Sequence, residues 1–170
     1  MIETLITSKT RVKLLLKFFL NSESKSYLRN LETEFGESTN AIRKELNNLS
    51  EAGLLLKVAD KNKIDYQANI NHPLFSNLQD IISKYLGLDK LLFTVLERMG
   101  NVHQVALVGD YARGIDSGKI EVQITGDELD ENYLESISSK LKTIIKKEVI
   151  FQIQQQITDP EALLIYEIKD

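Results

Sequence analysis

Apolar positions in the first third of this chain recur every three or four residues, which is the spacing of a helix with one buried face. Residues 10–20 and 27–35 show this spacing and predict two short helices. Residues 41–52 repeat it. The start signal Ser38-Thr39-Asn40 precedes this third segment and Gly53 follows it, so both ends of the third helix are marked in the sequence.

Shorter apolar runs follow the third helix. Residues 54–59 and 64–69 flank the polar turn Asp60-Lys61-Asn62-Lys63, and this arrangement predicts a two-stranded hairpin. Periodicity in the remainder predicts three helices and four strands. In chain order these are a helix opening at Pro73 over 73–86, a helix over 89–99, strands 105–108 and 120–124, a helix over 127–147, and strands 149–153 and 163–166.

Composition narrows the class of protein without defining it. The chain has 170 residues, an ordinary apolar fraction and no cysteine, so it can hold one large domain or two small ones but no disulfide or thiolate metal site. Its N-terminal apolar run is too short to span a bilayer and is interrupted by Lys13 and Lys17. We therefore expect a cytoplasmic protein without a membrane segment, a metal site or a cofactor.

The third predicted helix turns amide and cationic side chains outward. Asn40, Arg43, Lys44 and Asn47 lie off its apolar face, and such side chains contact base edges and phosphates in the major groove. The alternative is the solvated side of an ordinary amphipathic helix. The net charge of the chain is −4, but cations slightly outnumber acids in residues 1–70. The charge of this part of the chain is therefore compatible with binding to nucleic acid.

Helix, short link, polar-faced helix and lysine-tipped hairpin follow one another in the order of a winged helix-turn-helix. Residues 38–55, STNAIRKELNNLSEAGLL, resemble the recognition helix and first wing strand of bacterial ArsR- and MarR-like regulators. The resemblance implies a homodimer that binds double-stranded DNA, paired through residues 10–20 and 73–86. The side chains that it assigns to DNA contact are Ser38, Thr39, Asn40, Arg43, Lys44, Asn47, Lys61 and Lys63.

A second resemblance lies in residues 105–126, VALVGDYARGIDSGKIEVQITG, which are similar to the core of the minimal nucleotidyltransferase fold. That family has Gly-Ser after the first strand and Asp-x-Asp on the next, where this chain has Gly109-Asp110 and Lys119-Ile120-Glu121. A lysine cannot ligate Mg²⁺, and strand 149–153 with Gln154 offers glutamines but no third acid. The resemblance therefore implies a domain with no catalytic residue.

The residues that would remain as a candidate ligand pocket are Gly109, Asp110, Arg113, Lys119 and Glu121. A simpler interpretation is that Asp110 caps a helix and Glu121 is an exposed strand residue. The pocket would serve a small-molecule or protein partner of the C-terminal domain. The sequence also leaves open an active Mg²⁺-dependent nucleotidyltransferase, or an interaction subunit that binds neither DNA nor nucleotide.

These observations predict an α+β protein with an N-terminal winged helix-turn-helix domain and a small nucleotidyltransferase-like α/β domain with a mixed sheet. We expect the domains at residues 1–70 and 88–170, joined by a linking and dimerisation helix over 71–87. The same order of parts, with NINHPLFSNL and GDYARGIDSG as shared markers, resembles a group of bacterial transcriptional regulators. The expected function is therefore regulation of transcription, with a degenerate second domain for sensing or interaction.

Overall fold

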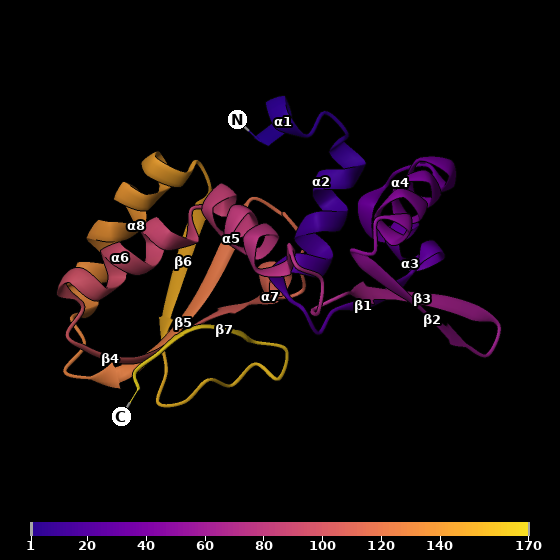
Figure 1. The fold of residues 1–170 in the computed structure, drawn as a ribbon. Helices are drawn as coiled ribbons and strands as arrows, with labels where there is room; N and C mark the ends of the chain where they lie inside the picture. Colours follow the sequence, from indigo (N-terminus) through magenta and orange to yellow (C-terminus); the bar gives the residue numbers. More distant parts are fainter. Residues whose placement is uncertain (1, 170) are drawn as a thin grey trace. The chain divides into compact units, whose positions relative to one another are not determined.

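The computed structural model describes residues 2–169, which form two compact units, Met1–Ile82 and Ser83–Asp170 (Figure 1). Helices and strands are mixed, and one of the two sheets is itself mixed, which confirms this part of the predicted fold class. The division between the units falls inside helix α5 (Phe75–Leu86), within the segment predicted to link the two domains. No helix of residues 2–169 combines the length and the apolar character needed to cross a bilayer.

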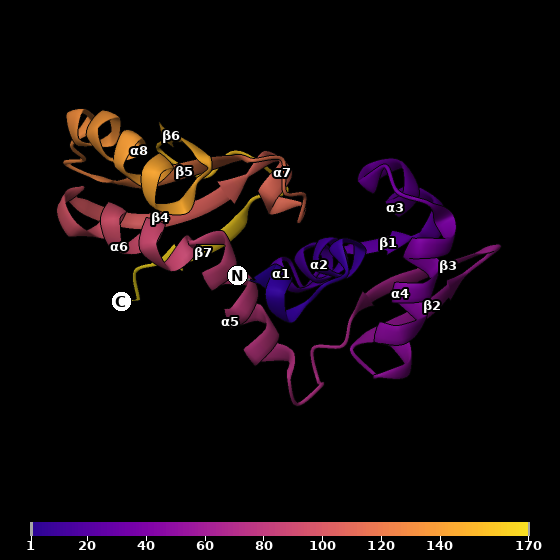
Figure 2. The same cartoon turned by 90° about the horizontal axis from the view of Figure 1, so that it is seen from above.

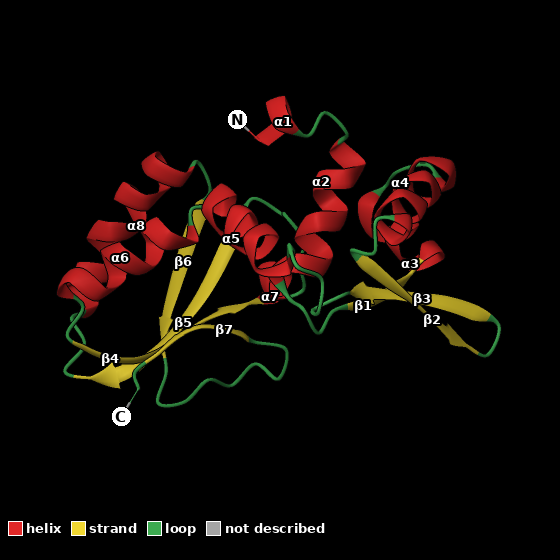
Figure 3. Cartoon of the chain, viewed as in Figure 1, coloured by secondary structure: helices red, strands yellow, loops and turns green. Residues whose placement is uncertain are grey.

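The first unit contains a group of helices and a small sheet (Figure 3). Its helices are α1 (Ile2–Leu5), α2 (Lys9–Leu15), η1 (Leu16–Leu20), α3 (Leu28–Phe35) and α4 (Thr39–Glu51). The predicted helix over 10–20 is present, but its last turn, η1, is wound as a π-helix. Gly36 ends α3 in the left-handed conformation, with φ +62°, which glycine adopts without steric cost.

Helix α2 and its last turn η1 are buried on more sides than their single apolar stripe predicted. All residues from Leu14 to Leu20 are buried within the chain, including Lys17. Phe19 also stacks against Phe75, with ring centroids 5.7 Å apart. This helix therefore contributes to the chain's own core, and only its first turns keep partly exposed side chains for the predicted dimer contact.

Three strands make the sheet of the first unit in the order β1-β3-β2, all antiparallel. Their bounds are Lys25–Tyr27, Leu55–Asp60 and Lys63–Ala68 for β1, β2 and β3. The hairpin β2-β3 was predicted, but β1 was not, because it lies in a polar connector without alternation. Pairing of Tyr27 with Asp65 brings β1 beside the hairpin.

A four-stranded mixed sheet forms the centre of the second unit, in the order β6-β5-β4-β7. The strands are β4 (Asn101–Val108), β5 (Lys119–Asp127), β6 (Glu148–Ile153) and β7 (Leu163–Glu167), and only the β5–β6 pair is parallel. Helices α6 (Leu88–Arg98) and α8 (Glu131–Ile145) lie side by side on one face of the sheet (Figures 1 and 2). The short helix α7 (Gly109–Ala112) follows β4 directly.

Side chains from both helices meet the sheet in a closed core. Leu91 and Val95 of α6, Leu141 of α8, and Val122 and Ile124 of β5 are all fully buried. The connection from β6 to β7 passes the opposite side of the sheet, where the amide of Gln123 bonds Thr158. Because the alternation along β5 turns Gln123 away from the helices, this connection covers the other face.

Candidate nucleic-acid interface

Helix α4 places a polar face outward because its apolar residues share one side. Ile42, Leu46 and Leu49 are buried, whereas Asn40, Arg43 and Lys44 are exposed and Thr39 and Asn47 are half-buried. Ser38 is the N-cap, and its hydroxyl accepts a hydrogen bond from the backbone N–H of Ala41 at 3.3 Å. The predicted contact residue Ser38 therefore supports the start of the helix with its side chain.

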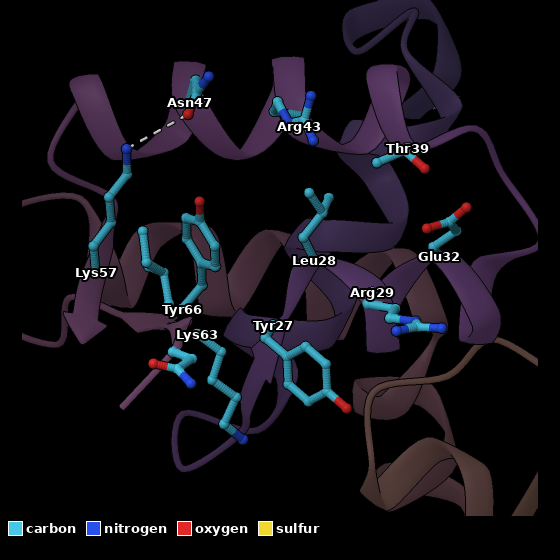
Figure 4. A pocket seen from close by; sticks show the side chains of 12 residues that line it. Tyr27, Leu28, Arg29, Glu32, Thr39, Arg43, Asn47, Lys57, Lys63 and Tyr66 are labelled. Atoms are coloured by element: carbon cyan, nitrogen blue, oxygen red, sulfur yellow. Dashed lines mark hydrogen bonds between the residues drawn. The ribbon is translucent and has the colours of Figure 1, made fainter. Parts of the chain in front are cut away.

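A groove of about 580 Å³ separates α4 from the sheet (Figure 4). It runs between the polar face of α4, the first turn of α3 and the hairpin β2-β3. Four residues predicted to contact DNA line it, namely Thr39, Arg43, Asn47 and Lys63, and the other four do not. The remaining lining residues are Tyr27, Leu28, Arg29, Glu32, Lys57, Asn62, Ile64 and Tyr66.

Two cations in this groove were absent from the predicted set. Arg29 lies in the first turn of α3, and Lys57 lies on β2 opposite Tyr66 of β3. Lys57 Nζ donates to Asn47 Oδ1 at 3.4 Å, so it orients an amide of α4 from across the groove (Figure 4). Strand alternation could have found Lys57, because it lies two residues after the buried Leu55 and therefore faces the same side as Leu55.

Tyr66 brings an aromatic ring into the groove beneath α4. Its hydroxyl points toward the helix (Figure 4). Burial raises the pKa of this phenol, and the positive charge of Arg43 opposes the shift, so the two groups are electrostatically coupled. Tyr66 was not predicted as a site residue, because its position under α4 depends on how the hairpin packs.

The two wing lysines have different surroundings. Lys63 Nζ lies 3.8 Å from both Asp60 and Asp65 and 4.5 Å from the centre of the Tyr27 ring. Lys61 is exposed at the turn with φ +51°. Within residues 2–169 no ion pair involves Lys61, so its charge is the more available of the two at the tip of the hairpin.

Three acidic residues of the first unit form ion pairs on the side of α2 and η1. Glu45 of α4 is buried and pairs with Arg11 at 2.8 Å. Glu37 pairs with Lys13 at 2.6 Å and accepts from Thr10, and Glu34 pairs with Lys17 at 2.9 Å. In each pair the cation belongs to α2 or η1.

These pairs also affect the carboxyl groups themselves. Burial opposes ionisation of Glu45, but hydrogen bonds from Ser8 and Arg11 outweigh it and lower the pKa. Burial likewise opposes ionisation of Glu37, and hydrogen bonds from Lys13 and Thr10 lower the pKa. Both acids are therefore held as anions inside the unit and are neutralised there, which leaves Glu32 as the acid that lines the groove.

The second candidate site lies in the other unit, at the turn from β4 into α7. Gly109 has φ +65°, and a methyl group there would overlap Glu121 Oε2. Glu121 in turn accepts a hydrogen bond from Lys119 Nζ at 2.7 Å. The structure thus brings Gly109, Lys119 and Glu121 together, and the exposed-strand interpretation of Glu121 is incomplete because it packs against the glycine.

Asp110 and Arg113 form a pair of their own beside this turn. Asp110 Oδ1 accepts from Arg113 at 2.8 Å, and Arg113 also lies 3.9 Å from Glu161. The backbone N–H of Gly109 donates to Asp159 at 3.4 Å. Both Asp159 and Glu161 come from the β6–β7 connection, a contribution that local sequence patterns did not indicate.

The strand predicted over residues 149–153, in which no acid was expected, begins one residue earlier in the structure. β6 starts at Glu148, which lies opposite Lys119 in the parallel register with β5. The hydrogen bond with Glu121 raises the pKa of Lys119, and the charges of Glu148 and Asp110 add to the shift. The Lys119 ammonium thus pairs with Glu121. Residues 2–169 contain no group of three or more acidic, histidine or cysteine side chains arranged to hold a metal ion.

Neither histidine adds a ligand set to these sites. His72 Nδ1 accepts from the backbone N–H of Leu74 at 3.1 Å, and His103 lies 3.1 Å from Asp127. No protein-family model matches the chain, and no curated protein is similar to it. The function of the chain is therefore inferred from the geometry of the two sites.

Proposed function

We propose that this protein is a DNA-binding transcriptional regulator that docks duplex DNA on the groove between α4 and the β2-β3 hairpin. In this proposal the first unit is a winged helix-turn-helix domain, α4 is the recognition helix and the hairpin is the wing. The second unit is a degenerate nucleotidyltransferase-like domain. The observation that carries the proposal is the placement of charge around α4, where Arg29, Arg43, Lys57 and Lys63 line the groove and Glu45 is buried against Arg11.

This placement of charge matters because the affinity of a protein for DNA depends mainly on how many phosphates it neutralises. Arg29, Arg43 and Lys57 reach the groove from three different elements. Glu45 would repel phosphate if it faced outward, but it is buried against Arg11. A merely solvated helix face does not require this inward pairing of Glu45.

Roles within the groove follow from side-chain chemistry. Arg43 can donate two hydrogen bonds to a guanine edge, and Asn47 can pair with an adenine edge. Lys57 and Lys61 would contact phosphates and position the domain without reading sequence. Asn40 and Lys44 are exposed on the same helix outside the groove, where they would contact the flanking backbone.

For the second unit we propose an interaction or sensing role without catalysis. Two-metal phosphoryl transfer needs several carboxylates converging on the cations. The residues present do not fit that cradle, because the Lys119 ammonium pairs with Glu121 and the Arg113 guanidinium pairs with Asp110. Incubation with labelled nucleoside triphosphates and Mg²⁺ should give no turnover. Turnover that Glu121→Gln abolishes would instead establish the alternative function of a nucleotidyltransferase.

The DNA proposal is tested by selecting bound duplexes from a random pool and then titrating salt. The slope of log affinity against log salt should approach about −0.9 for each phosphate contacted. Arg43→Ala should weaken binding by about 1–3 kcal/mol and relax the sequence preference, whereas Lys61→Ala should weaken all sequences alike. Lys140→Ala, on the exposed side of α8, is the matched control. Failure to select any sequence, or affinity independent of salt, would refute the proposal.

A further inference from the structure

The hydroxyl of Tyr66 is a polar group that the chain buries without giving it a hydrogen bond. The Tyr66 side chain is only 7% exposed. Within residues 2–169, no donor or acceptor of the chain is hydrogen-bonded to its hydroxyl. Burying a hydroxyl without a partner costs stability, because the group loses the hydrogen bonds that water would give it. This cost is offset when a ligand supplies the missing partner.

The hydroxyl opens into the groove between α4 and the β2-β3 hairpin. Tyr66 is one of the residues that line the groove, and its hydroxyl points toward α4 (Figure 4). Among residues 2–169, the side-chain oxygens that are both sealed from solvent and without a partner belong to Glu34 and Ser50. The Tyr66 oxygen is not sealed in this way, so a molecule in the groove can reach it.

Lys57 lies beside Tyr66 on the neighbouring strand. The two residues are directly opposite each other in the antiparallel register of β2 and β3, so their side chains share the face of the sheet that is turned toward α4. The Lys57 ammonium uses one N–H for Asn47 Oδ1 at 3.4 Å, and two remain for a ligand. A neutral donor and a cationic donor are therefore adjacent at the Tyr66 end of the groove.

The donors and charges at the Tyr66 end of the groove favour an anion. Burial raises the pKa of Tyr66 despite the opposing charge of Arg43, so the phenol keeps its proton at neutral pH and can donate it to a hydrogen bond. Glu32, the acid that lines the groove, lies at the opposite end (Figure 4). Donors that converge from two strands and a helix match a phosphate, because its oxygens accept hydrogen bonds from several directions.

We propose that the Tyr66 hydroxyl and the Lys57 ammonium together bind one phosphate group in the groove. The hydroxyl donates one hydrogen bond to a phosphate oxygen, and the ammonium supplies a positive charge and a second hydrogen bond. Arg43 of α4 adds its charge to the same end, and its guanidinium stays available for a base edge. The phosphate can belong to the backbone of DNA or to a free phosphorylated compound, since both present the same oxygens.

The inference deepens the proposed function, and it rests on that function for DNA as the source of the phosphate. Tyr66→Phe removes the hydroxyl and keeps the ring. On duplexes selected with the wild-type chain, the affinity of this variant should fall about tenfold for all sequences alike, because a phosphate contact carries no base preference.

The salt dependence of binding separates the hydroxyl from the lysine. Tyr66→Phe should leave the slope of log affinity against log salt unchanged, because a hydroxyl adds a hydrogen bond but no charge. Lys57→Ala should lower both the affinity and the magnitude of the slope. A changed slope or a changed base preference in Tyr66→Phe would contradict a phosphate contact by the hydroxyl.

Unfolding in urea distinguishes a binding hydroxyl from a structural one. Because the Tyr66 hydroxyl has no partner among residues 2–169, Tyr66→Phe should leave the urea midpoint unchanged or raise it. Tyr133→Phe is the matched control, since the Tyr133 hydroxyl donates to the backbone oxygen of Thr94 at 2.8 Å. This control should lower the midpoint and leave DNA affinity unchanged. A lower midpoint in Tyr66→Phe would assign its hydroxyl a structural role and overturn the proposal.

Inorganic phosphate tests the site without DNA. NMR chemical shifts of the hairpin amides, followed during a phosphate titration at constant ionic strength, give the dissociation constant. Tyr66→Phe and Lys57→Ala should each raise this constant about fivefold or more. Lys140→Ala, on the exposed side of α8, should leave it unchanged.

The two binding experiments separate failure of this inference from failure of the proposed function. An effect of Tyr66→Phe on DNA alone identifies the DNA backbone as the source of the phosphate. An effect on inorganic phosphate, in a chain that selects no duplex, would refute the proposed function and assign the site to a free phosphorylated compound. Duplex binding by the wild type with no effect of Tyr66→Phe in either experiment would overturn only the inference. A chain that binds neither DNA nor phosphate would refute both.

Discussion

Arg11 Nε donates to Glu45 Oε2 across 2.8 Å, which joins α2 to the buried side of α4. This pair is one of three that connect α2 and η1 to the acids of α3, α4 and the loop between them. The Arg11–Glu45 pair helps to hold α4 in position, and it keeps the Glu45 carboxylate off the side of α4 that faces the groove. Stability and the proposed recognition thus depend on the same contacts.

Among the three ion pairs, breaking Lys17–Glu34 should lower the free energy of unfolding the most. Both side chains are almost enclosed, and Glu34 Oε1 has no hydrogen-bond partner among the described residues. Lys17→Met would leave the carboxylate buried and unpaired, and we expect unfolding free energy to fall by about 3 kcal/mol in urea titrations. The double variant Lys17→Met with Glu34→Leu should recover most of the loss. Equal stability of wild type and the single variant would contradict this.

Acid should destabilise the first unit through Glu37 and Glu45. Burial opposes their ionisation, but hydrogen bonds and cations lower both pKa values below the ordinary 4.5. Their stabilisation is therefore fully present above that value and is lost as pH falls through the lower, folded-state values. Urea unfolding from about pH 7 to about pH 3 should show this loss. In Glu45→Gln the decline should be shallower, and an unchanged profile would exclude a contribution from Glu45.

Lys57→Ala should affect DNA binding in two ways. Loss of one phosphate contact should reduce the magnitude of the salt slope by about 0.9. Loss of the hydrogen bond to Asn47 frees that amide, so the base preference at one position should also weaken. Salt titrations on selected and single-substituted duplexes measure both effects. The variant Lys84→Ala, on α5 outside the groove, should change neither.

Gly109→Ala should destabilise the second unit by about 2 kcal/mol. The position has a left-handed backbone, and the new methyl group would overlap the Glu121 carboxylate. Glu121→Ala in the same chain should relieve the overlap but not the backbone strain, so it should recover part of the loss. Thermal melts of the four chains in this double-mutant cycle give the coupling energy. Full additivity would show that the two residues do not contact each other.

Local periodicity in the sequence was sufficient to predict most of the helices and strands of the first unit. The spacing of Ile42, Leu46 and Leu49, with Ser38 before and Gly53 after, defined α4 and its outward face, which the structure retains. Thr39, Arg43 and Asn47 could therefore be named from the sequence. The hairpin was equally predictable, since alternation and a polar turn are short-range signals.

Residues far apart in the sequence complete both sites. Arg29, Lys57 and Tyr66 join the groove only because β1 and the hairpin pack beneath α4, and Glu148 approaches Lys119 only through the parallel register of β5 and β6. The burial of Phe18 likewise came from packing. The sequence by itself determined most of the helices and strands and the outward face of α4, because 3.6-residue and two-residue periods are local properties of the backbone. Tertiary structure alone decided which of those faces meet, because strand register and helix packing depend on the whole core.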